Sequence, residues 1–221
     1  LMGAVVAEPT DLRLVVASKG CFRARVTFLG RAAHSAKPHL GINAISAAAR
    51  LVASIEEDPA LQVAPHPLLG PPTVNIGYIR GGVQINIVPQ ECEIEFDRRL
   101  VPGEDPDRIE QHYRSLAEQT AARFPGIVIR FERLLRDWPM ETDPASSVAT
   151  AAAAALAAAN LPNEPTGVPF GSDASKFSRM GAPAIVLGPG SIDQAHTPDE
   201  YVGVEEVVRA VEVYKQLIRR F

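Results

Sequence analysis

The clearest pattern in the chain is an alternation of apolar and polar residues over residues 21–30, CFRARVTFLG. Apolar side chains at every second position fall on one side of an extended backbone, so this segment predicts a half-buried antiparallel strand. Residues 72–82 (PTVNIGYIRGG), 91–100 (ECEIEFDRRL) and 127–135 (IVIRFERLL) also have strand character. Four strands are therefore expected in the first two thirds of the chain.

Two segments between these strands have helical periodicity instead. Residues 41–58 (GINAISAAARLVASIEED) carry apolar residues at helical spacing, and Pro59 ends the pattern. Residues 106–124 form a second amphipathic pattern that starts on a proline, a residue favoured in the first turn of a helix. The order over residues 21–135 is β-α-β-β-α-β. This order predicts a ferredoxin-like unit of four antiparallel strands with two helices on one face.

The remainder of the chain follows a different pattern. Residues 3–7 and 183–190 are short, wholly apolar runs, as expected for strands that are buried on both faces. An alanine-rich helix is expected over residues 145–160 and a last helix over residues 204–221. Apolar strands that alternate with helices are typical of an α/β domain with a parallel sheet.

The two patterns together predict the fold class and the domains. The fold is expected to be α/β with an α+β insertion. A ferredoxin-like domain of residues 20–136 interrupts an α/β domain made of residues 1–19 and 137–221. Because the chain opens directly on a buried strand that needs neighbours, most of the α/β domain is expected to lie upstream of residue 1.

Composition and charge exclude several classes of protein. The chain has 221 residues, 46% of them hydrophobic, and a net charge of −4 with both signs interleaved. No basic patch indicates a nucleic-acid partner or a membrane surface. The longest apolar run, residues 150–160, is too short to span a bilayer. Cys21 and Cys92 have no metal-type spacing and fit buried thiols in a reducing compartment, so a cytoplasmic protein is expected.

Two residues follow the apolar strands of the predicted α/β sheet. Glu8 comes after residues 3–7, and His196 lies in the loop after residues 183–190. Ligands of open α/β sheets bind outside the carboxyl ends of strands, and both side-chain types bind metal ions. A turn or capping role for Glu8 before Pro9, and a loop hydrogen bond for His196, are equally compatible with the local sequence. No second histidine or cysteine at ligand spacing accompanies His196.

Further polar groups offer substrate contacts. His34, in the loop of residues 30–45, can donate a hydrogen bond to a developing oxyanion. Arg99 offers a bidentate fork for a carboxylate, Asn86 an amide, and residues 171–175 (GSDAS) hydroxyl and backbone N–H groups. For each of them a solvated loop, a turn or a structural ion pair is an alternative interpretation.

Four stretches in this order resemble a known family. They are AEPTD (7–11), GRAAHSAKPHLGINAI (30–45), INIVPQECEIEFDRR (85–99) and LGPGSIDQAHTPDEY (187–201). The chain resembles the zinc-dependent M20-type amidohydrolases and peptidases, which include acetylornithine deacetylase, succinyl-diaminopimelate desuccinylase and aminoacylase-1. The last stretch is most similar to acetylornithine deacetylases. In that family the ferredoxin-like unit is a lid through which two subunits form a dimer.

The resemblance implies a role for each residue already singled out. Glu8 would bind one zinc ion of a two-zinc site and His196 the other. His34 would reach across the dimer and stabilise the tetrahedral oxyanion in the partner's active site. The residues implied to contact the substrate are Asn86, Arg99, Gly171 and Ser172. Arg99 would hold the substrate carboxylate.

The resemblance also implies what this chain does not contain. The family uses an upstream His-x-Asp motif, a bridging aspartate and a Glu-Glu pair, and residues 1–7 (LMGAVVA) include none of them. Two ligands on separate metals are not expected to hold either ion tightly. This chain is therefore expected to be an inactive, metal-free part of an enzyme whose cofactor is zinc, or cobalt in its place.

The expected activity of the whole enzyme is removal of an acyl group from an N-acyl amino acid, with N-acetyl-ornithine in arginine biosynthesis as the first expectation. Succinyl-diaminopimelate desuccinylation, or another aminoacylase or carboxypeptidase activity of the family, is the alternative within this class. A non-catalytic dimerisation module or a ligand-binding module is the alternative outside it. The expected partners are the substrate and a second copy of the chain, with no nucleic acid and no membrane.

Overall fold

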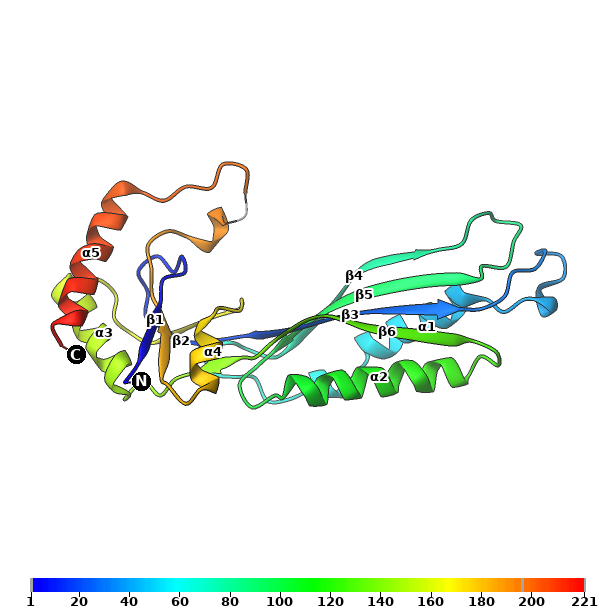
Figure 1. The fold of residues 1–221 in the computed structure, drawn as a ribbon, viewed down its shortest axis with the longest axis horizontal. Coiled ribbons are helices and arrows are strands. Elements are labelled where there is room, and N and C mark those ends of the chain that lie inside the picture. Colours follow the sequence, from blue (N-terminus) through cyan, green and yellow to red (C-terminus); the bar gives the residue numbers. More distant parts are fainter. Residues whose placement is uncertain (1, 196, 221) are drawn as a thin grey trace.

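The computed structural model describes residues 2–195 and 197–220. The molecule is elongated, and two β-sheets occupy its two ends (Figure 1). Both chain termini lie at the same end, with the chain running out to the far end and back. This path agrees with a ferredoxin-like unit inserted into an α/β unit.

The sheet at the far end has four strands. They are β3 (Gly20–Leu29), β4 (Thr73–Gly81), β5 (Glu91–Leu100) and β6 (Val128–Asp137). Their order in the sheet is β4-β5-β3-β6, and every neighbouring pair is antiparallel. The predicted ferredoxin-like arrangement is confirmed, and each of the four strands begins and ends within two residues of its predicted bounds.

Two helices cover one face of this sheet (Figure 1). They are α1 (Ala44–Glu56) and α2 (Pro106–Ala122). Phe22, Phe28 and Ile94 are 0–2% exposed and form one core with α1 and α2. The intervening strand residues are charged and lie on the opposite, open face. The alternation in the sequence therefore separates a helix-covered face from a polar one.

The sheet at the other end has five short strands. They are β1 (Ala4–Val6), β2 (Val15–Ser18), β7 (Met140–Glu141), β8 (Thr166–Val168) and β9 (Ala184–Val186). The order is β1-β9-β2-β7, with β8 also paired to β2. β1 and β9 are parallel, but β2 is antiparallel to both β7 and β9. The sheet is mixed rather than wholly parallel, because β2 enters it from the opposite direction.

Three helices flank this second sheet. They are α3 (Ser147–Ala158), α4 (Ala174–Arg179) and α5 (Val204–Ile218). Ala149, Ala152 and Ala155 of α3 are fully buried in a core shared with α5. The small side chains of α3 allow the two helices to approach closely, which explains the alanine-rich sequence. Short 3₁₀ turns at Pro38–Leu40, Pro59–Leu61 and Ile192–Gln194 complete the elements.

The four elements that periodicity did not predict are β2, β7, β8 and α4. Each has six residues or fewer, too short to display a strand or helix period. The fold class is nevertheless as predicted. The proposed domain bounds at residues 20–136 stay a prediction, with the chain crossing between the sheets at Lys19 and again at Trp138 and Pro139.

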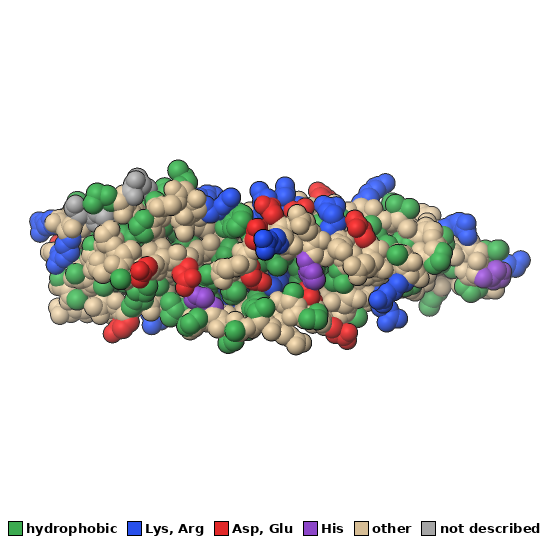
Figure 2. Space-filling view, turned by 90° about the horizontal axis from the view of Figure 1, so that it is seen from below, with side chains coloured by type: hydrophobic (Ala, Val, Ile, Leu, Met, Phe, Trp, Pro, Cys, Tyr) green, Lys and Arg blue, Asp and Glu red, His purple; other side chains and the backbone are tan. Residues whose placement is uncertain are grey.

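The surface adds two observations. Lysine, arginine, aspartate and glutamate side chains are intermixed on the helix-covered side of the molecule (Figure 2). Among the described residues, no helix combines the length and the apolar character needed to cross a membrane. Cys21 and Cys92 are free thiols that are 3% and 0% exposed, so the prediction of buried thiols is confirmed.

Candidate functional site

The loops after β1 and β9 meet at the carboxyl end of the parallel strand pair. A Cβ atom at Gly188 would lie 2.5 Å from the carbonyl oxygen of Glu8, so only glycine allows this approach. The Gly188 N–H donates to the Thr10 hydroxyl at 3.1 Å and fixes the two loops together. Glu8 therefore occupies the sheet edge where ligands of α/β proteins bind. His196, the other predicted metal ligand, lies outside the described residues.

The described residues do not fit a metal centre by themselves. Across 2–195 and 197–220, no group of three or more histidine, cysteine, aspartate or glutamate side chains is close enough together to hold an ion. Glu8 would contribute a single carboxylate, whereas a protein zinc site usually has three or four ligands. A complete metal site would therefore need ligands beyond those that the described residues supply.

A cavity of about 610 Å³ is lined in part by Ala7 and Pro9, the residues on either side of Glu8 in the chain. Pro9, Gly190, Tyr201 and Val211 contribute to its wall, so it runs from the two loops to helix α5. Most of this wall is apolar, and it can take a hydrocarbon portion of a bound molecule. Its position next to Glu8 makes it part of the candidate site.

Arg99 and the loop of residues 171–175 approach each other at the junction between the two sheets. Arg99 lies opposite Cys21 in the β3–β5 ladder, two residues beyond the chain crossing at Lys19. A Cβ atom at Gly171 would lie 3.5 Å from the carbonyl oxygen of Lys19. The Ser172 hydroxyl accepts from the Ala174 N–H at 3.1 Å and so stabilises the start of α4. The structure brings Arg99, Gly171 and Ser172 to one region.

Arg99 has an internal partner in this region. Its Nε donates to Asp97 Oδ1 at 2.7 Å, and Asp97 also accepts from Arg23 Nε at 2.7 Å. Arg99 is thus held in place by a structural ion pair, the alternative that the sequence left open. A bound carboxylate would share the Arg99 guanidinium with Asp97, and the guanidinium has donors on both edges for this purpose.

Lys19 is a residue of this region that sequence reasoning missed. It is 5% exposed, and its Nζ donates to the Pro71 carbonyl at 2.6 Å. Burial lowers the pKa of the Lys19 ammonium, and the positive charges of Arg98 and Arg99 lower it further. The available signal was a single lysine inside the otherwise uncharged run VVASKGCF.

His34 and Asn86 lie together at the far tip of the ferredoxin-like sheet. His34 and Ile87 form an isolated antiparallel bridge, and the Ser35 N–H donates to the Asn86 carbonyl at 2.9 Å. The Ala36 N–H donates to His34 Nδ1 at 3.1 Å. A neutral ring with Nδ1 as acceptor carries its hydrogen on Nε2, so the exposed edge of His34 is a donor.

The tip is at the opposite end of the molecule from β1 and α5 (Figure 1). Within one chain, His34 and Asn86 are therefore not brought to Glu8. The described residues predicted for the site form three groups: the sheet edge with Glu8, the junction with Arg99 and Gly171, and the tip with His34. Only a second molecule can bring the tip group to one of the others.

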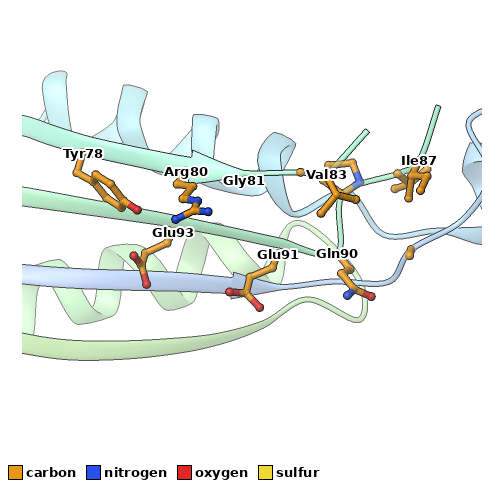
Figure 3. Close-up of a pocket in the computed structure, with 12 residues that line it drawn as sticks. Tyr78, Arg80, Gly81, Val83, Ile87, Gln90, Glu91 and Glu93 are labelled. Carbon is orange, nitrogen blue, oxygen red and sulfur yellow. The ribbon is translucent and has the colours of Figure 1, made fainter. Parts of the chain in front are cut away.

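A second cavity, of about 600 Å³, lies on the open face of β4 and β5 close to the tip. Tyr78, Arg80, Glu91 and Glu93 project from these strands toward the same side (Figure 3). Ile87, the neighbour of Asn86, also lines it. Arg80, Glu91 and Glu93 are charged and occupy the open-face positions of two alternating strands. This pattern indicates exposure to solvent but does not by itself indicate a binding site.

Comparisons with known proteins agree with this architecture. Residues 16–125 match the M20 peptidase dimerisation domain. The acetylornithine deacetylase of Myxococcus xanthus is 34% identical over 223 residues, which cover 99% of this chain and 57% of the relative. The acetylornithine deacetylase of Proteus mirabilis is 30% identical, with 99% and 56% covered.

Solved structures share the fold. Aminopeptidase PepT from Bacillus cereus has a TM-score of 0.82 at 22% identity, covering 99% of this chain and 57% of its own. A tripeptidase from Staphylococcus aureus has a TM-score of 0.80 at 22% identity. The fold shared with these structures is an α/β unit with an inserted domain, and the inserted part contains most of the dimerisation-domain match. The chain belongs to the M20 family of peptidases and amidohydrolases. It spans about 57% of the length of the curated relatives that it matches.

Proposed function

We propose that this chain supplies the lid and part of the catalytic domain of a metal-dependent amidohydrolase that deacylates N-acyl amino acids, with N-acetyl-ornithine as the substrate. The observation that carries the proposal is the loop pair at the carboxyl end of β1 and β9, where Ala7 and Pro9, on either side of Glu8, line a cavity of about 610 Å³. The similarity to acetylornithine deacetylases, which extends over 99% of this chain, supports the choice of substrate.

The chain's own residues have defined tasks in this reaction. Water adds to the acyl carbonyl, the C–N bond breaks, and the amine leaves with a proton. The His34 Nε2–H of a second subunit donates to the oxyanion that forms on the acyl oxygen. Arg99 binds the substrate carboxylate beside Gly171 and Ser172. Zinc, held through Glu8, His196 and ligands outside this chain, would polarise the carbonyl and activate the water.

The active form in this proposal is a homodimer joined through the lid. β4 and β6 are the two edge strands of the four-stranded sheet. β6 carries Arg130, Glu132, Arg133 and Arg136, and charged edges oppose pairing with another chain. β4 carries one charge, Arg80. The exposed apolar side chains near the β4 edge are Ile45, Ile79, Val83 and Ile85. β4 is therefore the edge that pairs with the second subunit.

The test is hydrolysis by the full polypeptide that contains this chain. Purified protein loaded with zinc is incubated with N-acetyl-ornithine, N-succinyl-diaminopimelate and an unrelated dipeptide, and the released amine is measured. Preferential release of ornithine supports the proposal. Preferential hydrolysis of N-succinyl-diaminopimelate would overturn N-acetyl-ornithine as the substrate and put the succinyl compound in its place. Protein that hydrolyses none of the three overturns the proposal. The 221-residue chain alone is the negative control.

A further inference from the structure

The chain crosses between the two sheets at two points that touch each other. Lys19 joins β2 to β3, and Trp138 with Pro139 joins β6 to β7. A Cβ atom at Gly20 would lie 2.5 Å from the Pro139 nitrogen and 2.6 Å from the Asp137 carbonyl oxygen. Two extended segments in contact form a narrow connection. Such a connection permits bending of one sheet relative to the other, as in other hinge-linked units.

A third segment connects the two sheets away from this hinge. The loop of residues 62–71, here named the strap, belongs to the lid because it joins α1 to β4. Its His66 Nε2 lies 3.0 Å from Oε1 of Glu141, which is on β7 of the other sheet. The His66 side chain is 11% exposed and that of Glu141 is 56% exposed, so the ring is packed against the protein while the carboxylate stays open to water.

The strap is shaped for this contact by its own hydrogen bonds. The His66 N–H donates to the Gly70 carbonyl at 3.0 Å, and the Gly70 N–H donates back at 2.9 Å. Gly70 has a φ of 69°, which favours glycine. The Leu68 N–H donates to His66 Nδ1 at 3.2 Å. With Nδ1 as acceptor, a neutral His66 ring directs its Nε2–H at Glu141.

Two more contacts hold the strap at its C-terminal side. Gly167 of β8 faces it so closely that a Cβ atom there would lie 2.6 Å from Leu69 Cδ2 and 2.8 Å from the Leu68 carbonyl oxygen. The buried Lys19 ammonium donates to the Pro71 carbonyl at 2.6 Å, which ties the strap to the hinge itself. The strap therefore reaches β7, β8 and the crossing segment.

We propose that the strap fixes the angle between the two sheets and that His66 and Lys19 are positioning residues. The two crossing segments alone would allow the sheets to bend relative to each other. The contacts of the strap lie away from the hinge and therefore prevent this bending. Arg99 is on the lid side of Lys19, and Gly171 and Ser172 are on the other side. The strap thereby sets the separation between Arg99 and Ser172. The consequence for substrate binding rests on the proposed function, whereas the mechanical role does not.

The test follows the angle between the two sheets through a distance measured across them in the 221-residue chain. Spin labels are placed on exposed positions by Glu118→Cys on α2 and Arg209→Cys on α5, and the label-to-label distance distribution is recorded by pulsed electron resonance. Cys21 and Cys92 are buried, so they stay unlabelled in the folded chain. The variants are His66→Ala, Glu141→Ala, the double variant, and Gly167→Ala. His39→Ala, an exposed histidine in the same domain, is the matched control.

The parent chain and His39→Ala are expected to give one narrow distribution. His66→Ala and Glu141→Ala are expected to broaden it equally, and the double variant no further. Exchange protection of the Gly70 amide is expected to fall about tenfold in His66→Ala, because loss of the side-chain bonds of His66 lets the turn that holds this amide open more often. Unchanged distributions in the variants at both His66 and Gly167 overturn the proposal. If His66→Ala fails to fold, Glu141→Ala, with a partly exposed side chain, carries the test.

Kinetics of the full-length dimer then separate this inference from the proposed function. His66→Ala is expected to raise KM for a substrate with a free carboxylate and to leave kcat within about twofold, because it removes positioning without removing a group that meets the reacting atoms. A parent enzyme without hydrolytic activity would overturn the function and leave the distance measurement as the test of the strap.

Discussion

At the scale of single residues, His34 is the side chain whose role most depends on a neighbour outside its own chain. It is exposed, its Nδ1 accepts from the Ala36 N–H at 3.1 Å, and its Nε2 edge is directed away from that turn. An oxyanion donor with this geometry must act on a site that approaches the tip from outside.

We expect His34→Ala to lower kcat of the full-length enzyme by about 10²–10³-fold, the usual effect of removing one oxyanion donor. Zinc content, measured by elemental analysis, is expected to be unchanged, because His34 is proposed to donate to the oxyanion and is not one of the proposed zinc ligands. His39→Ala, in the same loop, is the control and should retain the parent rate. Loss of zinc from His34→Ala would contradict the assigned role.

Cys21 gives a prediction about pH. Burial, followed by the negative charge of Asp97, raises the pKa of the Cys21 thiol from 9.0 to about 11. A thiol whose pKa is raised on folding binds its proton more tightly in the folded state. Its contribution to stability is therefore full below pH 9.0 and is lost as the pH rises through about 11.

Two measurements check this behaviour of Cys21. Alkylation by iodoacetamide at pH 8.5, followed by mass spectrometry, should be slow in the folded chain and fast after unfolding in guanidinium, because the thiolate is the reactive form. Urea titrations should give a free energy of unfolding that falls between pH 9 and 11 and falls less in Cys21→Ser. Rapid labelling of Cys21 in the folded chain would rule out the raised pKa.

At the scale of elements, the two edge strands of the lid have opposite character. β6 is protected by alternating charges, and β4 presents uncharged and apolar side chains. Exposed apolar edges are the ones that pair with another chain. This difference is what supports β4 as the dimer edge.

We expect Ile79→Lys, on β4, to convert the dimer to monomer at micromolar concentration. The introduced charge would be buried unpaired at the joined edge, and burial of an unpaired charge is strongly unfavourable. Leu134→Lys, on β6, places the same charge on the other edge and should leave the dimer intact. Light scattering measures both. A parent chain that is strictly monomeric would contradict the assignment.

The elements also differ in how far sequence could predict them. β3 and β5 have ten residues each and display a full alternation, so their bounds were predicted nearly to the residue. β2 has four residues, all of them buried, and joins three neighbours. A four-residue apolar run has no diagnostic period, and only contacts with distant strands define it.

At the scale of the whole molecule, the two sheets have separate hydrophobic cores. Phe28 belongs to the core formed with α1 and α2, and Leu156 to the core formed by α3 and α5. The connection between them consists of the two crossings and the strap. Units with separate cores and narrow connections can unfold independently.

We expect calorimetry of the chain to resolve two unfolding transitions. Phe28→Ala should lower the midpoint temperature of one transition and Leu156→Ala that of the other. Each shift should correspond to a loss of about 2–5 kcal/mol in the free energy of unfolding, as for other large-to-small core substitutions. A single transition that both substitutions lower equally would contradict the predicted division at residues 20–136.

The sequence by itself determined the elements whose side chains repeat with a period: the four long strands, the helices α1, α2, α3 and α5, and the order that makes a ferredoxin-like lid. It also placed Glu8 after a short apolar strand, whose residues are half-buried in this chain. Only the tertiary structure decided where β2 pairs, that Arg99 is held by Asp97, and that Lys19 and His66 join the two sheets. The physical reason is that periodicity records which side of an element is buried. Contacts between residues far apart along the chain follow instead from how the finished elements pack, and these contacts define the junction.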